Sequence, residues 1–360
     1  KGESVPFAPN VLSVTVREPL GVVGAIIPWN VPMLLMALKV APALVAGNAV
    51  VVKSAEEAPL AVLRICEIMN RVLPPGVFNM VSGFGPECGA PLVAHPLVKK
   101  VTFTGSVETG KIVYRAAAEK LIPVTLELGG KSPMIVFADC DFDKTVSGAL
   151  TSMRFTRQGQ SCTAASRIYV ERPIFDRFVT AMKDAVNGMV MGDPLDEKTD
   201  IGTIISQGQF DKVKGFIAEG TATSGATAHV CSRMPEDPAL KKGLFLQPVI
   251  FTGLTRESRL VQEEIFGPVV TLQPFENESE ALALANGTPF GLAAQVWTSD
   301  LRLAHRVAQQ LKFGLVWVNC WMIRDLRTPF GGAKASGIGR EGGVESLRFF
   351  TEPTNVCIKV

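Results

Sequence analysis

Long apolar runs alternate with segments of mixed polarity along the first third of the chain. Residues Val22–Ile27 and Ala49–Val52 are apolar without a break, which is typical of parallel strands buried on both faces. Helices are expected over residues 32–44 and 60–72, the second strand should reach Lys53, and further strands are expected over 77–81 and 100–104. Because strands that alternate with helices form parallel sheets, this pattern predicts a doubly wound α/β domain.

A second alternating block extends from Met134 to about Thr328, which predicts a second α/β domain. Its strands are expected at 135–137, 168–170, 269–272 and 316–319, and its helices at 142–155 and 175–188. Leu12–Arg17 and Asn355–Val360 instead alternate apolar and polar residues, which predicts exposed strands. An exposed strand edge invites pairing with another subunit.

Composition and charge narrow the class of protein. The 360 residues are enough for two sizeable domains, and a net charge of +2 without a basic block argues against a nucleic-acid partner. The seven cysteines are scattered, without CxxC or Cys/His spacing, so we expect no disulfide framework, no metal site and a reducing, cytoplasmic location. The longest apolar run, residues 37–52, is too short and too interrupted to span a membrane.

Polar residues follow the buried strands predicted for the first block. Asn30, Lys53 and the pair Gly105–Ser106 each stand at the carboxyl end of one strand. Ligands of such sheets bind outside these ends, so a nucleotide is expected here. Gly83–Gly89 is a near-match to a dinucleotide fingerprint, but its last interval is one residue too long. We therefore assign the phosphate contact to Ser106 and the helix that should follow it.

Cys162 follows Gly159-Gln160-Ser161, and its neighbours are small or polar. A core cysteine usually lies among larger apolar residues, whereas thiolate chemistry suits a partly open, polar loop. Taken alone, this motif leaves a catalytic nucleophile and an ordinary loop cysteine equally open.

Glu127 stands at the end of an apolar strand, just before Gly129-Gly130. A strand-edge glutamate that faces solvent is the commoner case. A carboxylate held among apolar residues can instead serve as a general base.

In this order, the segments Thr125–Pro133 and Gly159–Cys162 resemble the aldehyde dehydrogenase superfamily, and the resemblance extends from about Pro19 to Val360. A typical member carries more residues at its N-terminus, and this chain begins at Lys1 rather than Met. We therefore expect a truncated sequence.

The resemblance implies that Cys162 attacks an aldehyde as a thiolate, and that oxidation by NAD turns the thiohemiacetal into a thioester. Asn30, in Pro28-Trp29-Asn30, would stabilise the oxyanion with the Cys162 backbone N–H, and Glu127 would activate the water that hydrolyses the thioester. A loop or helix-capping role is the alternative for Asn30. Glu341 would relay the proton outward, and a plain surface carboxylate is the alternative for that residue.

The same resemblance implies the cofactor contacts. Lys53 and Glu56 resemble the residues that bind the adenosine ribose of the cofactor. A carboxylate at this position would repel the 2′-phosphate of NADP. Glu264 and Phe266 resemble the residues that contact the nicotinamide ribose. Phe330 lies in the segment that would close over the nicotinamide ring. The other expected contacts are Ile27, Pro28, Trp29, Gly105, Ser106, Leu128 and Gly129.

Trp321–Phe330 looks like the 2-hydroxymuconate and 2-aminomuconate semialdehyde dehydrogenases, as do residues 139–144 and 342–347. Arg324 could therefore hold the carboxylate of an anionic substrate in a bidentate pair. A structural pair with Asp325 or another acid is the alternative. Gly159–Ala165 looks more like members that act on a broad range of aldehydes or on aromatic aldehydes, so these substrates also stay open.

Two other interpretations are an inactive truncated homologue and a CoA-acylating member. The presence of Asn30, Glu127 and Cys162 argues against a loss of catalytic activity. Glu127 favours hydrolysis of the thioester by water over transfer of the acyl group to CoA. Arg157 and Ser54 depart from the usual Asn and Pro, but neither position carries chemistry.

The resemblance also divides the chain. Residues 1–19 would form part of an oligomerisation arm, 20–129 an NAD-binding domain without its N-terminal part, 130–335 the catalytic domain, and 336–360 a return segment with the second arm strand. A homodimer or homotetramer is expected, with a small aldehyde as substrate and no membrane partner.

Overall fold

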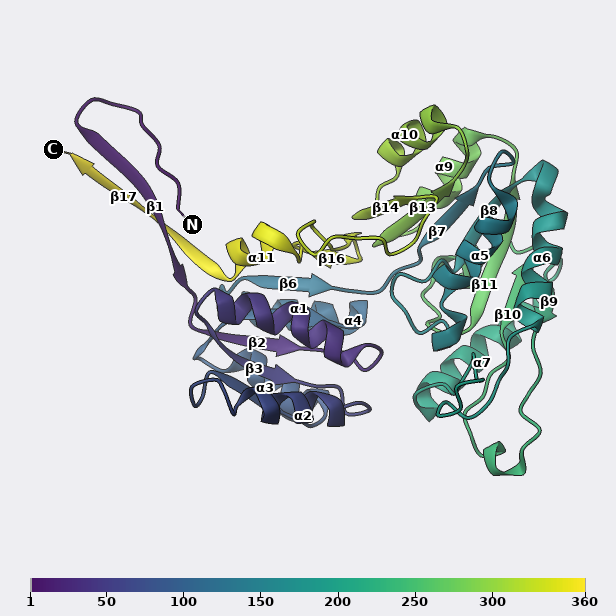
Figure 1. Cartoon of the computed structure of the whole chain (residues 1–360), viewed down its shortest axis with the longest axis horizontal. Helices are drawn as coiled ribbons and strands as arrows, with labels where there is room; N and C mark the ends of the chain where they lie inside the picture. Colours follow the sequence, from purple (N-terminus) through teal and green to yellow (C-terminus); the bar gives the residue numbers. More distant parts are fainter. Residues whose placement is uncertain (1, 360) are drawn as a thin grey trace. The chain divides into compact units, whose positions relative to one another are not determined.

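The computed structural model describes residues 2–359, which form two compact units. Unit 1 contains the residues up to Glu127, Asp325–Gly331 and the residues from Ile338 onward. Unit 2 contains Leu128–Arg324 and Gly332–Gly337. Each unit has a largely parallel sheet with helices (Figure 1), so the predicted α/β class is confirmed.

Unit 1 has a six-stranded sheet with the order β16-β6-β5-β2-β3-β4. Its strands are β2 (Val22–Ile26), β3 (Ala49–Lys53), β4 (Phe78–Val81), β5 (Val98–Thr104), β6 (Val124–Glu127) and β16 (Gly337–Ile338). One face is covered by α1 (Pro32–Val45), α2 (Leu60–Met69) and α11 (Gly343–Phe349), and the other by a π-helical turn η1 (Gly85–Gly89), α3 (Ala90–Ala94) and α4 (Val107–Ala118). The sheet is therefore wound on both sides.

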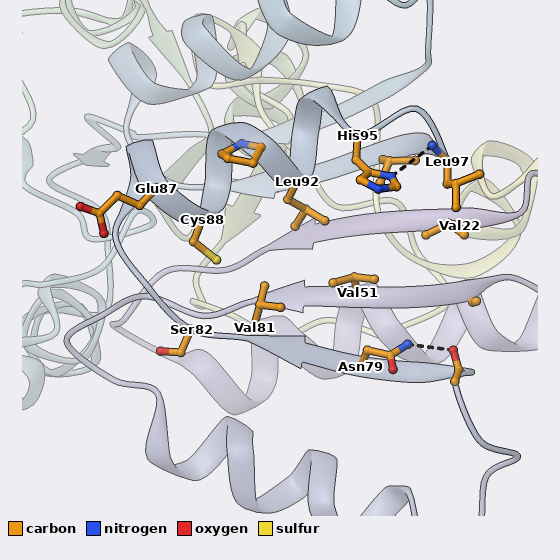
Figure 2. Close-up of a pocket in the computed structure, with 14 residues that line it drawn as sticks. Val22, Val51, Asn79, Val81, Ser82, Glu87, Cys88, Leu92, His95 and Leu97 are labelled. Carbon is orange, nitrogen blue, oxygen red and sulfur yellow. Dashed lines mark hydrogen bonds between the residues drawn. The ribbon is translucent and has the colours of Figure 1, made fainter.

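Strand β3 shows why the central strands are apolar without a break. Val50 and Val52 are buried in the core beneath α1 and α2, while Val51 faces the other side of the sheet. On that side a cavity of about 680 Å³ lies between the strands and α3, where Leu92 and His95 face the strand side chains (Figure 2). None of the predicted site residues lines this cavity.

A separate two-stranded ribbon joins the two ends of the described chain. Strand β1 (Val11–Pro19) pairs antiparallel with β17 (Thr351–Lys359) in one continuous register (Figure 1). The predicted C-terminal strand thus begins four residues earlier than expected, and its predicted end, Val360, lies outside the described residues. Both strands are largely exposed.

Unit 2 has a seven-stranded sheet with the order β14-β13-β7-β8-β11-β10-β9, in which only β9 runs antiparallel to its neighbour. The strands are β7 (Pro133–Val136), β8 (Arg167–Glu171), β9 (Thr227–Val230), β10 (Val249–Thr252), β11 (Val269–Phe275), β13 (Ala293–Trp297) and β14 (Leu315–Val318). The helices α5 (Phe142–Met153) and α6 (Phe175–Asn187) pack on one core cluster, and α9 (Glu278–Asn286) and α10 (Leu301–Gln310) on another. A third cluster lies beside α7 (Gln207–Ala222) and α8 (Arg259–Gln262).

Two predicted helices end two or three residues earlier than expected. α2 stops at Met69 rather than residue 72, with Asn70 as its C-cap, and the chain continues to Leu73 in hydrogen-bonded turns. α5 stops at Met153 rather than residue 155, because Arg154 adopts the left-handed conformation (φ 61°) that terminates helices. Helix α7 was not predicted, since Gly208, Gly215 and Gly220 weaken its helical signal.

Three charged side chains are buried on the α1 face of the unit 1 sheet. Lys39 Nζ on α1 lies 2.5 Å from Glu341 Oε1 and also donates to Thr102 Oγ1 at 3.2 Å. Lys100, on β5, lies over the Phe349 ring with its Nζ 4.8 Å from the centroid. Burial and, to a smaller extent, the Lys39 charge lower the pKa of Lys100 to about 7, although the Glu341 charge opposes the shift.

We predict that Lys100 makes the stability of the protein depend on pH. Between pH 7 and the usual lysine pKa of about 10.4, the unfolded chain binds the extra proton, so wild-type stability rises with pH. Relative to Lys100→Met, the unfolding free energy of the wild type should therefore rise by up to about 1.4 kcal/mol per pH unit in this window. Urea denaturation between pH 6.5 and 9.5 measures the difference.

Lys99→Met is the matched control, because Lys99 is the exposed neighbour on the same strand. Its stability should follow the wild type at every pH. Parallel pH profiles for the wild type and Lys100→Met would contradict the prediction.

Candidate functional site

A cavity of about 610 Å³ lies in unit 1 at the carboxyl ends of β2, β3 and β5. Its size is typical of pockets that hold small molecules and cofactors. Seven predicted cofactor residues line it: Ile27, Pro28, Trp29, Lys53, Glu56, Gly105 and Ser106. Of the polar residues predicted at three strand ends, Lys53 and Ser106 line this cavity, and Asn30 is not among its lining residues.

Lys53 and Glu56 form an ion pair at the rim of this cavity, with Nζ and Oε2 2.8 Å apart. Burial acts to raise the pKa of Glu56, but the hydrogen bond and charge of Lys53 outweigh it and leave that pKa lowered. Glu56 is therefore a carboxylate at neutral pH. A charged acceptor beside an ammonium donor suits the two hydroxyls of a ribose.

Ser106 is the N-cap of α4, and its Oγ accepts a hydrogen bond from the Thr109 N–H at 3.2 Å. Next to it, a Cβ on Gly105 would lie 2.5 Å from the Phe103 ring, so only glycine fits there. A helix N-terminus that opens into a cavity suits a phosphate group. The residues that line the cavity thus fit a dinucleotide.

Sequence reasoning missed another part of the lining. Gly85, Pro86 and Gly89, from the π-helical turn η1, line the same cavity. The only signal for them was the near-match to a dinucleotide fingerprint, which was set aside because of its spacing. The turn brings these residues to the cavity although the spacing departs from the pattern.

Glu127 ends strand β6 and is 5% exposed, so the interpretation of a solvent-facing edge glutamate is wrong. Its backbone carbonyl accepts a hydrogen bond from the Gly105 N–H at 3.1 Å. A Cβ on Gly331 would lie 2.5 Å from Glu127 Oε1, so the carboxylate rests against the glycine that follows Phe330.

Glu341 is 2% exposed, so its alternative as a surface carboxylate is also wrong. It pairs with Lys39, and its backbone exchanges two hydrogen bonds of 2.6 Å with Phe330. Lys39 was not predicted as a site residue, although a lysine inside the apolar run 37–52 was a usable signal. The N-cap of α1 is Val31 rather than Asn30, so helix capping does not explain Asn30.

The Cys162 loop in unit 2 is a series of tight turns. Gly159 has a φ of 64°, and its N–H donates to the Arg154 carbonyl at 2.9 Å. A Cβ on Gly159 would lie 2.0 Å from the Gly267 carbonyl, so the loop needs glycine here. The Gln160 side chain accepts from the Ile205 N–H at 3.1 Å, and Cys162 itself is half-buried.

Glu264 lies against the loop that follows Glu127 in the chain. The Gly130 N–H donates to Glu264 Oε1 at 2.8 Å, and a Cβ on Gly129 would lie 2.2 Å from Glu264 Oε2. Phe266 has a φ of 58°, which is unfavourable for an aromatic residue, and the Gln209 amide holds its carbonyl at 2.8 Å. Glu264 and Phe266 therefore occupy constrained positions.

Arg324 is half-buried in the loop that follows β14. The Trp317 indole N–H holds the neighbouring carbonyl of Ile323 at 3.1 Å. Arg154, which was not predicted, lies over Trp321 in the same loop, with its Cζ 5.0 Å from the ring centroid. In unit 1, Asp325 pairs with Arg327 at 2.5 Å, which gives that acid a partner other than Arg324.

The predicted residues are divided between the units. Unit 1 carries Asn30, Glu127, Phe330, Glu341 and the cavity residues, and unit 2 carries Leu128, Gly129, Cys162, Glu264, Phe266 and Arg324. Among residues 2–359, no group of three or more His, Cys, Asp or Glu side chains could hold a metal ion. No helix in the described part of the chain has the length and apolarity needed to cross a membrane.

The chain is similar to known proteins over nearly all of its length. The chain is 49% identical to a 2-hydroxymuconic semialdehyde dehydrogenase of Pseudomonas sp. (strain CF600), over 99% of this chain and 74% of the relative. It is 46% identical to a 2-aminomuconic 6-semialdehyde dehydrogenase of Pseudomonas sp., over 99% of this chain and 73% of the relative.

Among solved structures, betaine aldehyde dehydrogenase from Staphylococcus aureus in complex with NAD+ is 40% identical, with a TM-score of 0.95 over 99% of this chain and 71% of that chain. The NAD+ complex of an aldehyde dehydrogenase from Bacillus cereus has the same identity and TM-score, over 100% of this chain and 72% of that chain. The model of the aldehyde dehydrogenase family matches residues 1–356. The chain therefore belongs to the aldehyde dehydrogenase family.

Proposed function

We propose that the chain oxidises an aldehyde to a carboxylate with NAD, through covalent catalysis at Cys162. The observation that carries the proposal is the loop that presents Cys162. Its turns are fixed by Gly159 and by backbone hydrogen bonds, and its cysteine is half-buried rather than part of the core. Membership of the aldehyde dehydrogenase family supports the reaction.

In the proposed mechanism the Cys162 thiolate bonds to the aldehyde carbon. The Asn30 amide and the Cys162 N–H then donate to the resulting oxyanion. When bound, NAD would supply the oxidising power by accepting the hydride that leaves the former aldehyde carbon. A thioester is left on Cys162, and Glu127 removes a proton from the water that hydrolyses it. Glu341, which is buried and paired with Lys39, is the proposed relay for this proton.

The unit 1 cavity is the proposed site for NAD. Lys53 and Glu56 would hold the adenosine ribose, and Ser106 with the N-terminus of α4 would hold phosphate. Glu264 and Phe266 would hold the nicotinamide ribose, and Phe330 would cover the ring. The NAD+ in two similar solved structures supports this choice of cofactor.

The proposed substrate is an anionic semialdehyde of the 2-hydroxymuconate type. Two similar relatives are named for 2-hydroxymuconic and 2-aminomuconic semialdehydes. Arg324 is the proposed carboxylate contact, in a loop stiffened by Trp317 and by the stacking of Arg154 on Trp321. A broad-range or aromatic aldehyde is the second candidate, favoured by the small residues from Ser161 to Ala165.

We further propose that the protein acts as a homodimer or homotetramer in the cytoplasm. The exposed ribbon of β1 and β17 supports the first part, because its free strand edges can pair with another subunit. The scattered free cysteines support the second.

Glu127→Gln should stall the enzyme after oxidation. The variant can still form the thioester, but it lacks the base that activates water. We expect a burst of NADH of about one equivalent per active site, followed by steady-state turnover reduced by roughly 100-fold or more. Stopped-flow absorbance measures the burst, and intact mass spectrometry detects an acyl adduct on the protein.

Cys162→Ser is the control, because it should give neither the burst nor the adduct while NAD still binds. Full turnover by Glu127→Gln without an adduct would exclude Glu127 as the base. NADH production by Cys162→Ser above a trace would exclude Cys162 as the nucleophile.

Glu56→Gln should narrow a preference for NAD over NADP. The Glu56 carboxylate repels a 2′-phosphate, and removing its charge lifts this repulsion while Lys53 remains. The measurement is the ratio of kcat/KM for the two cofactors. Glu57→Gln is the matched control, since Glu57 also lines the cavity but has no ion pair with Lys53 within the described chain. Its effect should be smaller, and a wild-type preference for NADP of tenfold or more would refute the prediction.

Arg324→Ala should weaken binding of an anionic semialdehyde selectively. A charge-assisted pair contributes about 1.5–3 kcal/mol, so KM should rise roughly 10- to 150-fold. The KM for a neutral aldehyde such as benzaldehyde should change little. Steady-state kinetics on both substrates makes the comparison.

Arg327→Ala is the matched control, because Arg327 is highly exposed and already paired with Asp325. It should leave both KM values nearly unchanged. Equal losses on charged and neutral substrates in Arg324→Ala would instead mean that Arg324 supports the loop, and would favour the broad-range interpretation.

A further inference from the structure

Arg167, the first residue of β8, is a cation that is fully buried in unit 2. No salt bridge to it exists within residues 2–359, and its four side-chain hydrogen bonds all reach neutral oxygens. Burying a charge is costly even when it is well hydrogen-bonded, and an apolar residue of similar volume is often no worse for stability. Arg167 therefore requires an explanation other than the stability of the fold.

Two of the four acceptors belong to the last turn of α9. Arg167 Nη1 donates to the Leu284 carbonyl at 3.0 Å, and Nη2 donates to the Ala285 carbonyl at 2.9 Å. Carbonyls at the end of a helix lack partners within it and carry partial negative charge. The guanidinium is thus anchored to the end of a helix that packs against the sheet.

The third acceptor lies in the loop that begins at Leu128. Arg167 Nε donates to the Lys131 carbonyl at 2.8 Å, and the remaining acceptor is the Tyr169 hydroxyl at 3.0 Å. The guanidinium therefore connects this loop to the C-terminal end of α9.

The same loop touches two proposed site residues. Gly130 donates its N–H to Glu264 at 2.8 Å, and a Cβ on Gly130 would lie 2.3 Å from the Cys162 carbonyl. A Cβ on Gly129 would lie 2.2 Å from Glu264. A shift of this loop by a fraction of an ångström would therefore change the surroundings of both Glu264 and Cys162.

We propose that Arg167 is a positioning residue, which ties the Lys131 carbonyl to α9 and so holds Gly129 and Gly130 against Glu264 and Cys162. This inference rests on the proposed role of Glu264 in binding NAD. Arg167 itself touches neither cofactor nor substrate.

The Lys131 side chain shows that the charges here act on one another. Its Nζ is buried and has no hydrogen-bond partner in the described chain. Burial and, to a smaller extent, the Arg167 charge lower the pKa of Lys131 to about 7, although the Glu264 charge opposes the shift.

The test is a double-mutant cycle between Arg167→Met and Glu264→Gln, read out as the dissociation constant of NAD by calorimetry. If Arg167 acts through the loop, each single variant should weaken NAD binding, by roughly 10- to 100-fold for Arg167→Met. The double variant should be little worse than either single variant, because both changes remove the same contact. Arg167→Lys can still donate one hydrogen bond to the Lys131 carbonyl and should recover part of the loss.

Tyr169→Phe is the matched control. It removes one acceptor of Arg167 but leaves the hydrogen bond to the Lys131 carbonyl, so it should lower the thermal midpoint without changing NAD affinity. Wild-type affinity in Arg167→Met, or additive losses in the cycle, would overturn the inference. If instead Glu264→Gln binds NAD as tightly as the wild type, the proposed role of Glu264 fails.

Amide hydrogen exchange of the folded Arg167→Lys variant provides a readout that needs neither NAD nor the methionine variant. Exchange over residues 128–132 should be faster than in the wild type, and exchange in α6, away from the loop, should match it. Unchanged protection of residues 128–132 would overturn the inference.

Discussion

The close contact of the Gly129–Gly130 backbone with Glu264 and Cys162 is the constraint on which the site in unit 2 depends. Any Cβ at either glycine would overlap the Glu264 carboxylate or the Cys162 carbonyl. The absence of side chains lets one backbone loop touch both residues, and a hydrogen bond from Gly130 fixes the orientation of Glu264. Arg167 holds the next residue of the loop by a hydrogen bond to its carbonyl. One short loop therefore determines the geometry of a proposed nucleophile and a proposed cofactor contact.

In unit 1, the surroundings of Glu127 depend on a buried ion pair. Lys39 and Glu341 come from distant parts of the chain and form an ion pair out of contact with solvent. Such a pair adds little net stability, but loss of one partner leaves an uncompensated charge. It fixes the segment of Glu341, which exchanges backbone hydrogen bonds with Phe330, and the next residue, Gly331, lies against Glu127. The buried pair thus connects α1 to the surroundings of the proposed base.

Several features could be predicted because they depend on local chemistry. The strand Ala49–Lys53 was predicted with its observed bounds, because a short, uninterrupted apolar run between turn signals is typical of a buried strand. The gathering of Lys53 and Ser106 around one cavity follows from parallel topology, in which all carboxyl ends share one edge. The early end of α5 could not be predicted, because a left-handed arginine gives no signal in composition.

The sequence by itself determined the α/β class, the strand ends that form the unit 1 cavity, and the motifs around Glu127 and Cys162. It could do so because periodicity and glycine spacing are local properties of the chain. Only the tertiary structure decided that Glu127 and Glu341 are buried, that Lys39 pairs with Glu341, and that η1 lines the cavity. It also decided that Arg167, which looks like an ordinary residue at the start of a strand, reaches the end of α9 and the Lys131 carbonyl. These contacts join residues 36 to 302 positions apart, and whether a charge is buried depends on what packs against it. No local pattern of residues contains that information.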